Sequence, residues 1–340
     1  MKKLLIAVLL AVMVIGNAAA VEVKFTDVPD AWGDFAAIED ELREKVIEKY
    51  GKYEKGEKLN KGIGNANALA AGGGYMRTAN GYDWITVALS VNGAVSMESI
   101  GDFNDDFIDE FEDEGDLYMG AGLQVITASV GFNLGHLLKW DHGLYITLKG
   151  GVSKLSTSDF DFDAYNLGFM VNYQLLEAKD LGRVIKWRGL NVGAGLNYFS
   201  STLKWTVDDL DPVRVGDFKY DTDLDVKSET SRFIIPVEIN TGIKLTIVEL
   251  FGGLGADFMF GGDNEVSVDS DAVVTKSGDD VNKGKANMTM SKDGDLDTVK
   301  FRFTVGLGFT LGPVHIEIPY TQYFDENYIG AIGIIGGVAF

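Results

Sequence analysis

The chain has 340 residues, with 51 acidic residues against 30 basic ones and a formal net charge of −21. This balance argues against nucleic acid as a partner, because phosphate backbones are bound by clustered Lys and Arg. The chain has no Cys, which excludes disulfides, thiol catalysis and Cys-based metal sites. It has 42 Gly and only 5 Pro, a composition suited to strands that pair on both sides.

Residues 1–20 have the organisation of a secretory signal peptide. Lys2 and Lys3 precede an uncharged apolar core at 4–16, and alanines at 18–20 supply small residues for cleavage. The core has about 13 residues, whereas a helix that spans a membrane needs ~20, which disfavours a membrane anchor. We expect the mature chain to be exported without this segment.

Residues 21–82 do not share the pattern of the rest of the chain. An apolar stripe at helical spacing predicts a helix over 34–53, with Asp34 as its N-cap. The stripe consists of Phe35, Ile38, Leu42, Val46, Tyr50 and Tyr53. The Gly-, Asn- and Ala-rich stretch at 62–74 predicts a loop.

Apolar and polar residues alternate in segments from residue 83 to the C-terminus. In the clearest segment, Val299, Phe301 and Phe303 share one face, while Lys300 and Arg302 share the other. A strand between lipid and a lumen needs such faces, so we expect an all-β, antiparallel transmembrane β-barrel. Ten strands are expected at 83–95, 117–133, 143–155, 161–175, 187–205, 230–245, 248–261, 297–311, 313–321 and 328–340.

The lengths of the connections support this barrel over a soluble β-sandwich. Long acidic connections at 96–116, 206–229 and 262–296 alternate with shorter connections at 134–142, 176–186, 246–247 and Gly312. Outer-membrane barrels have long outer loops, short periplasmic turns and both strand termini on the periplasmic side. The long connections could hide a further hairpin at Val213–Lys219 or at Val266–Val274, so twelve and fourteen strands are the alternatives to ten.

The barrel would occupy 83–340, with 21–82 as a helical and loop segment at or in its periplasmic mouth. The helix could lie across this mouth, or the segment could enter the lumen as a plug. A ten-stranded barrel has little free interior, which favours the mouth.

The last strand ends on an aromatic residue after alternating apolar positions. The positions are Tyr328, Ile332, Ile334, Val338 and Phe340. This pattern resembles the C-terminal signature of bacterial outer-membrane β-barrel proteins. The resemblance implies a place in the outer membrane, lipid as a partner, and a C-terminus that the barrel-assembly machinery reads.

The inward faces of the predicted strands collect ionisable side chains. These could line a selective pore for a small charged solute, or they could fill a narrow lumen with mutually satisfied ion pairs, which we favour. The set comprises Lys149, Glu238, Lys244, Glu249, Asp257, Lys300, Arg302, His315 and Glu317.

Two acidic stretches could bind Ca²⁺ or Mg²⁺, since hard cations prefer oxygen ligands. The second stretch lacks the Gly and Glu of an EF-hand, and charge runs in loops are usually only solvated. We therefore expect no cofactor beyond weakly bound Ca²⁺ or Mg²⁺. The candidate ligands are Asp102, Asp105, Asp106, Asp109, Asp293, Asp295 and Asp297.

An enzymatic function is not expected. A ten-stranded barrel resembles the outer-membrane aspartyl proteases of the omptin type, whose Asp and His pairs lie at the outer rim. The three histidines here, His136, His142 and His315, fall elsewhere in the predicted topology. The chain has no G-x-S-x-G elbow and no H-E-x-x-H helix.

Two functions therefore remain. One is a narrow pore or transport protein for small solutes. The other is a surface interaction or adhesion protein that uses its acidic loops on a closed barrel, with an extracellular ligand that the sequence does not identify. A soluble periplasmic β-protein is a third alternative.

Overall fold

The computed structural model describes residues 22–30, 32–50, 54–77, 84–98, 118–140, 143–157, 160–207, 210, 212–293, 298–324 and 328–340. Within these ranges it has helices α2 (Phe35–Tyr50), α3 (Glu54–Gly72) and α4 (Leu134–Leu138). None of these helices is long and apolar enough to cross a membrane. The strands are β1 (Glu22–Thr26), β2 (Ile85–Glu98), β3 (Tyr118–Asn133), β4 (Leu144–Ser156), β5 (Phe160–Leu176), β6 (Lys179–Asp180), β7 (Ile185–Val207), β8 (Val213–Val215), β9 (Phe218–Thr222), β10 (Leu224–Leu245), β11 (Val248–Phe260), β12 (Asn264–Lys276), β13 (Asp279–Asp293), β14 (Val299–Leu311), β15 (Val314–Phe324) and β16 (Tyr328–Ala339).

Ten of the described strands close into a ring in which every neighbouring pair is antiparallel. The order is β2, β3, β4, β5, β7, β10, β11, β14, β15 and β16, and β16 pairs with β2. The terminal residue seals the ring, because the N–H of Trp84 donates to the carbonyl oxygen of Phe340 at 2.7 Å and the N–H of Phe340 donates to Ile85 O at 2.9 Å. The predicted ten-stranded antiparallel barrel is confirmed.

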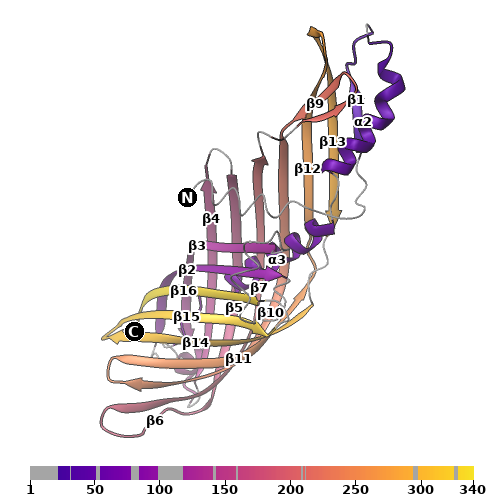
Figure 1. Cartoon of the computed structure of the whole chain (residues 1–340). Coiled ribbons are helices and arrows are strands. Elements are labelled where there is room, and N and C mark those ends of the chain that lie inside the picture. Colours follow the sequence, from indigo (N-terminus) through magenta and orange to yellow (C-terminus); the bar gives the residue numbers. More distant parts are fainter. Residues whose placement is uncertain are drawn as a thin grey trace, which may run out of the picture.

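The two ends of the barrel differ in their connections. At one end, here called the turn end, tight turns at 246–247 and 312–313 join β10 to β11 and β14 to β15. Trp84 and Phe340 also lie at this end. We call the opposite end, to which β12 and β13 connect, the loop end (Figure 1).

The outward surface of the ring is apolar and has a row of aromatic rings on the loop-end side. The ring centroids of Tyr165 and Tyr198 are 5.9 Å apart, those of Tyr198 and Phe233 are 4.8 Å apart, and those of Phe233 and Phe260 are 5.7 Å apart. This row crosses four neighbouring strands, β5, β7, β10 and β11. At the turn end, Trp84 is 57% exposed. Aromatic rows at the two edges of an apolar band are typical of barrels in a membrane.

The aromatic row also marks a change in polarity along β10. On the turn-end side of the row, the outward positions include Phe233, Ile235 and Val237, and beyond it they are Asp225 and Lys227. From Phe233 to the end of β10, about 12 residues at ~3.3 Å and a tilt of ~40° span roughly 30 Å along the barrel axis. This length fits the apolar core of a bilayer.

The sheet continues past the aromatic row at the loop end. Strands β7 and β10 have 23 and 22 residues, about twice the length that a membrane crossing requires. The hairpin β12–β13 pairs with the upper part of β10, β1 pairs with β13, and the hairpin β8–β9 pairs with β12. These strands form the loop-end sheet. The further hairpins considered at 213–219 and 266–274 are thus present, but they extend the sheet outside the ring and do not raise its strand number.

Helix α2 packs on the loop-end sheet (Figure 1). Its side chains Phe35, Leu42 and Val46 are buried in one apolar core with Trp32 and with side chains of β8, β9, β10, β12 and β13. This position differs from the expected one across the periplasmic mouth. The apolar stripe of α2 needs an apolar surface, which the loop-end sheet provides.

Candidate functional site

The lumen of the barrel is filled by the C-terminal half of α3 and the segment that follows it. Residues 63–71 are all buried, although they consist largely of Ala and Asn. Helix α3 lies against β2 and β3 and also contacts β7, β10 and β16. The sequence favoured a loop at 62–74 and a position at the mouth. The structure has a helix inside the barrel instead, because small side chains let the helix fit in a narrow lumen.

Two glycines of β3 make the close approach of α3 possible. A Cβ atom at Gly120 would overlap the carbonyl carbon of Gly62, and one at Gly122 would lie 2.5 Å from the carbonyl carbon of Ala66. Both distances are far inside a normal contact. The helix backbone therefore rests directly on the backbone of the wall.

The chain crosses the lumen in one direction, from the loop end to the turn end. Gly62 lies beside Ser96, near the loop end of β2. Gly73 lies against Asn92 of the same strand, which is nearer to the turn end. The N–H of Arg77 donates to Glu317 Oε2 at 3.0 Å, near the turn end of β15. Each successive contact is closer to the turn end, where β2 begins. Residues 61–77, here called the plug, thus join two opposite ends of the barrel.

Lys149 of β4 holds the plug at the end of α3. Its ammonium donates to the carbonyl oxygens of Ala71 and Gly73, the latter at 2.7 Å. It also lies over the ring of Tyr75, 4.2 Å from the centroid. The hydroxyl of Tyr75 donates in turn to Asn197 Oδ1 at 2.5 Å. A buried lysine therefore satisfies backbone groups that follow the helix end.

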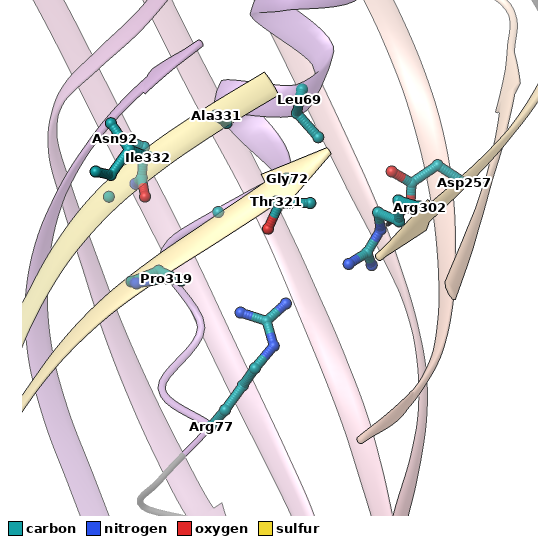
Figure 2. Close-up of a pocket in the computed structure, with 12 residues that line it drawn as sticks. Leu69, Gly72, Arg77, Asn92, Asp257, Arg302, Pro319, Thr321, Ala331 and Ile332 are labelled. Atoms are coloured by element: carbon teal, nitrogen blue, oxygen red, sulfur yellow. Dashed lines mark hydrogen bonds and ion pairs between the residues drawn. The ribbon is translucent and has the colours of Figure 1, made fainter. Parts of the chain in front are cut away.

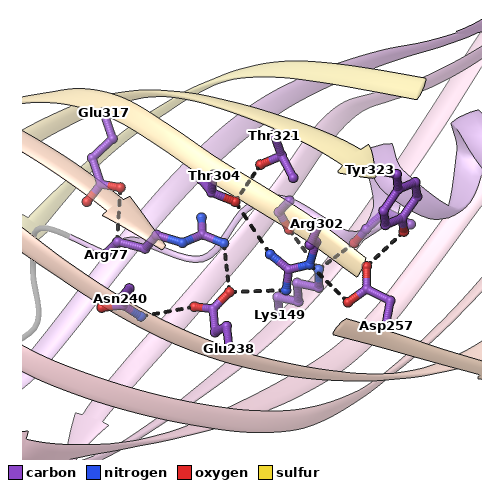
Figure 3. Close-up of polar contacts among 12 residues, drawn as sticks. Arg77, Lys149, Glu238, Asn240, Asp257, Arg302, Thr304, Glu317, Thr321 and Tyr323 are labelled. Carbon is purple, nitrogen blue, oxygen red and sulfur yellow. Dashed lines mark hydrogen bonds and ion pairs between the residues drawn. The ribbon is translucent and has the colours of Figure 1, made fainter. Parts of the chain in front are cut away.

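An ion-pair network joins the plug to the wall on the other side of the lumen (Figure 3). Nη2 of Arg77 lies 3.0 Å from Oε2 of Glu238, and Nη2 of Arg302 lies 3.1 Å from the same oxygen. Nε of Arg302 lies 3.0 Å from Oδ1 of Asp257, whose second oxygen accepts from the hydroxyl of Tyr323 at 2.8 Å. All five side chains are buried.

The structure thus brings five of the predicted lumen residues into contact with the plug or its partners. Lys149, Glu238, Asp257, Arg302 and Glu317 form this group.

The other four predicted lumen residues have separate contacts among the described residues. Glu249 is buried near the turn end, where Nε of Arg188 lies 3.4 Å from its Oε1, and its strand neighbour Lys244 is only half-buried. His315 Nδ1 lies 3.5 Å from the hydroxyl of Thr310. Lys300 is buried, with its ammonium 5.9 Å from the ring centroid of Tyr323.

Sequence reasoning missed three members of this site. Arg77 and Tyr75 fall in the segment that we placed at the mouth, and Tyr323 lies two residues beyond our limit for its strand. The apolar alternation of β15 is interrupted at Gln322, so alternation does not mark Tyr323 as part of the strand. No periodic pattern marks Arg77.

A pocket remains between the plug and the wall (Figure 2). The pocket beside Arg77 and Arg302 has about 20 Å³ open to the centre of a water molecule, and its lining includes Leu69, Pro319 and Ile332. This volume holds roughly one water. Among the described residues, the plug therefore occupies much of the lumen beside this pocket.

The proposed cation ligands lie almost wholly outside the described residues. Asp102, Asp105, Asp106, Asp109, Asp295 and Asp297 are not described, nor is the side chain of Asp293. Within the described ranges, no group of three or more His, Asp or Glu side chains could hold a metal ion.

Comparisons with solved structures find bacterial outer-membrane β-barrels. The translocator domain of the autotransporter NalP from Neisseria meningitidis is 12% identical and has a TM-score of 0.35, with 81% of this chain and 93% of that chain covered. A FadL homologue from Pseudomonas aeruginosa is 8% identical with a TM-score of 0.28, and the match covers 82% and 98% of the two chains. Ail of Yersinia pestis is 10% identical with a TM-score of 0.21, and the match covers 76% of this chain and 99% of that chain. None of these low scores indicates a function for this chain.

A search among proteins of curated function finds no match. At the level of sequence families, the model for Lsa36-like proteins matches residues 19–338, nearly the whole chain. The chain therefore belongs to the Lsa36-like family.

Proposed function

We propose that this protein is a closed outer-membrane barrel that displays the loop-end sheet as a surface for interaction with partners outside the cell. The observation that carries this proposal is the plug inside the lumen, where the pocket beside Arg77 and Arg302 has room for about one water. A barrel with a closed lumen acts as an anchor, and what it presents at the loop end then determines its function.

The outward surface supports membrane residence. An apolar band between aromatic side chains fits lipid, and the outward positions of β10 become charged where the loop-end sheet begins. In this proposal the signal peptide at 1–20 directs export, the turn end faces the periplasm, and the loop end faces the exterior. Phe340 would be read by the assembly machinery, and its backbone is already part of the seam that closes the ring.

Solute transport is less well supported than interaction. Glu238, Asp257 and Arg302 pair with one another and with Arg77 of the plug, so these buried charges have partners within the protein and are not free to bind a solute. The proposal requires no catalytic step and no cofactor.

Conductance measurements test whether the lumen is closed. The full-length mature protein, inserted in a planar lipid bilayer in potassium chloride, should give no stable channel steps, while an open porin in the same bilayer gives them. Stable steps from the unmodified protein would overturn the closed-barrel proposal.

Attachment measurements test the interaction role. Replacing the hairpin at 264–293 by a tight turn removes β12 and β13 and leaves the ring strands in place. Expressing cells should attach to protein-coated supports more than cells without the protein do, and cells with this variant should lose most of that attachment while the barrel still shows heat-modifiable gel mobility. Equal attachment by wild type, variant and cells without the protein would contradict the display role.

A further inference from the structure

The N-terminal segment of the mature chain lies at the end of the barrel opposite to the two termini of the ring. The ring begins and ends at the turn end, where Trp84 pairs with Phe340. At the loop end, by contrast, β1 pairs with β13, with Glu22 opposite Thr289, and Nζ of Lys276 lies 2.7 Å from Oδ1 of Asp34. Residues 22–50 are therefore on one side of the apolar band, and Trp84 is on the other.

The described part of the connection between these two sides, the plug at 61–77, runs inside the closed ring. The plug passes Ser96, Asn92 and Glu317 in that order, each nearer to the turn end. A route through the surrounding lipid would expose the charged side chains of β1 and α2 to hydrocarbon, at a cost of several kcal/mol each. The lumen offers a polar path across the apolar band, and the plug occupies this path.

We propose that the barrel serves as the conduit through which its own N-terminal segment crosses the membrane. The plug is the part of the chain that stays inside the lumen after this crossing. The substrate of this translocation is the stretch at 22–50. It includes bulky side chains such as Trp32 and Phe35, so it passes through the lumen as an extended chain. A 16-residue helix such as α2 is marginal by itself in water, so the segment need not cross as a folded unit.

Folding at the loop end gives the crossing its direction. On arrival, α2 buries Phe35, Leu42 and Val46 against the loop-end sheet, and β1 buries Val23 there. Each buried large apolar side chain favours the docked state. The loop-end sheet, in turn, has its apolar core covered only when the segment reaches it. The proposal rests on membrane residence, and it assigns the barrel an activity beyond display.

The absence of Cys from the chain makes the sidedness directly measurable. Glu44 is exposed on α2, Asp269 is exposed on the loop-end sheet, and Glu177 is exposed at the turn end. Single Glu44→Cys and Asp269→Cys variants should both react with a membrane-impermeant maleimide on intact cells. Glu177→Cys should react at least tenfold less until the outer membrane is permeabilised. Labelling of Asp269→Cys but not Glu44→Cys on intact cells would overturn the translocation and leave the closed barrel intact.

A matched pair of glycines tests the route. Gly122 of β3 faces the lumen against α3, whereas Gly93 of β2 faces outward, and a Cβ there meets only Leu123 Cδ1 at 3.9 Å. In the Glu44→Cys background, Gly122→Leu should lower labelling on intact cells at least fivefold, and Gly93→Leu should leave it unchanged. Heat-modifiable gel mobility and the labelling of Asp269→Cys report whether each barrel has formed. Undiminished labelling in a folded Gly122→Leu barrel would overturn the lumenal route. If Gly122→Leu does not fold, the labelling of Glu44→Cys compared with that of Glu177→Cys still decides on which side of the membrane α2 lies.

Discussion

Arg77 and Glu238 are 161 residues apart in the sequence, yet Nη2 of Arg77 lies 3.0 Å from Oε2 of Glu238 inside the barrel. One belongs to the plug and the other to β10 of the wall. The same carboxylate also accepts from Arg302 and from the side-chain amide of Asn240. The plug is thus held by charge about midway along the ring, and nearer the loop end it is held by close backbone packing on Gly120 and Gly122.

Arg77→Ala should loosen the plug. Glu238 keeps Arg302 and Asn240 as partners, so we expect a loss of about 1–3 kcal/mol in the free energy of unfolding, the cost of an incompletely satisfied buried group. Urea titration in lipid vesicles, followed by heat-modifiable gel mobility, measures this loss. The variant should also give brief channel openings in planar bilayers.

Lys154→Ala is the matched control for Arg77→Ala. It also removes a cation from an ion pair, with Asp163 at 3.4 Å, but both side chains are exposed. Exposed pairs contribute ~0–1 kcal/mol, so stability and conductance should stay near wild type. Equal effects of the two substitutions would show that the Arg77 network does not retain the plug.

Gly120→Ala should destabilise the filled barrel. The added methyl group would overlap the backbone of Gly62, and overpacking of this kind costs about 1–3 kcal/mol. Gly93→Ala should change the free energy of unfolding by less than about 0.5 kcal/mol, because its methyl group would lie 3.9 Å from Leu123 Cδ1, an ordinary van der Waals contact. Urea midpoints of the two variants give the comparison, and a neutral Gly120→Ala would mean that α3 does not rest on β3.

The docking of α2 should weaken in acid. Nζ of Lys276 donates to both oxygens of Asp34, at 2.7 and 2.8 Å, and this hydrogen bonding holds the pKa of Asp34 below its usual value of 3.8. Because the folded-state pKa is the lower one, the stabilisation is complete above about pH 4 and declines as the pH falls through the folded-state pKa. Hydrogen exchange of α2 amides, corrected for intrinsic rates, should therefore speed up below pH 4, and Asp34→Asn should abolish this dependence.

The ring was predictable because its strands share a two-residue alternation of apolar and polar side chains, and because long and short connections alternate between them. Phe301 and Phe303 could be placed on the lipid face from alternation alone, and the long and short connections favoured ten strands over the alternatives of twelve and fourteen. The hairpins at 213–219 and 266–274 were visible as candidates. Alternation could not tell that they extend the sheet outside the ring, because that depends on pairing between distant strands.

The plug was not predictable in the same way. Residues 62–74 have no apolar stripe, since Gly, Asn and Ala do not distinguish one helix face from another. What makes this stretch helical is its enclosure, and enclosure depends on Gly120 and Gly122 of a strand some sixty residues away. Likewise, α2 was predicted as an amphipathic helix, but its stripe did not specify which apolar surface would cover it.

Leu42→Ala should undock α2 without opening the ring. The side chain of Leu42 is fully buried in the core between α2 and the loop-end sheet, and a large-to-small change in such a core costs about 2–5 kcal/mol. Limited proteolysis of intact protein in vesicles should then cleave within 35–50 at least tenfold faster than in wild type, while the heat-modifiable barrel remains. Glu44→Ala, on the exposed face of the same helix, should leave the cleavage rate unchanged. If Leu42→Ala were as resistant as Glu44→Ala, α2 would not be held by this core.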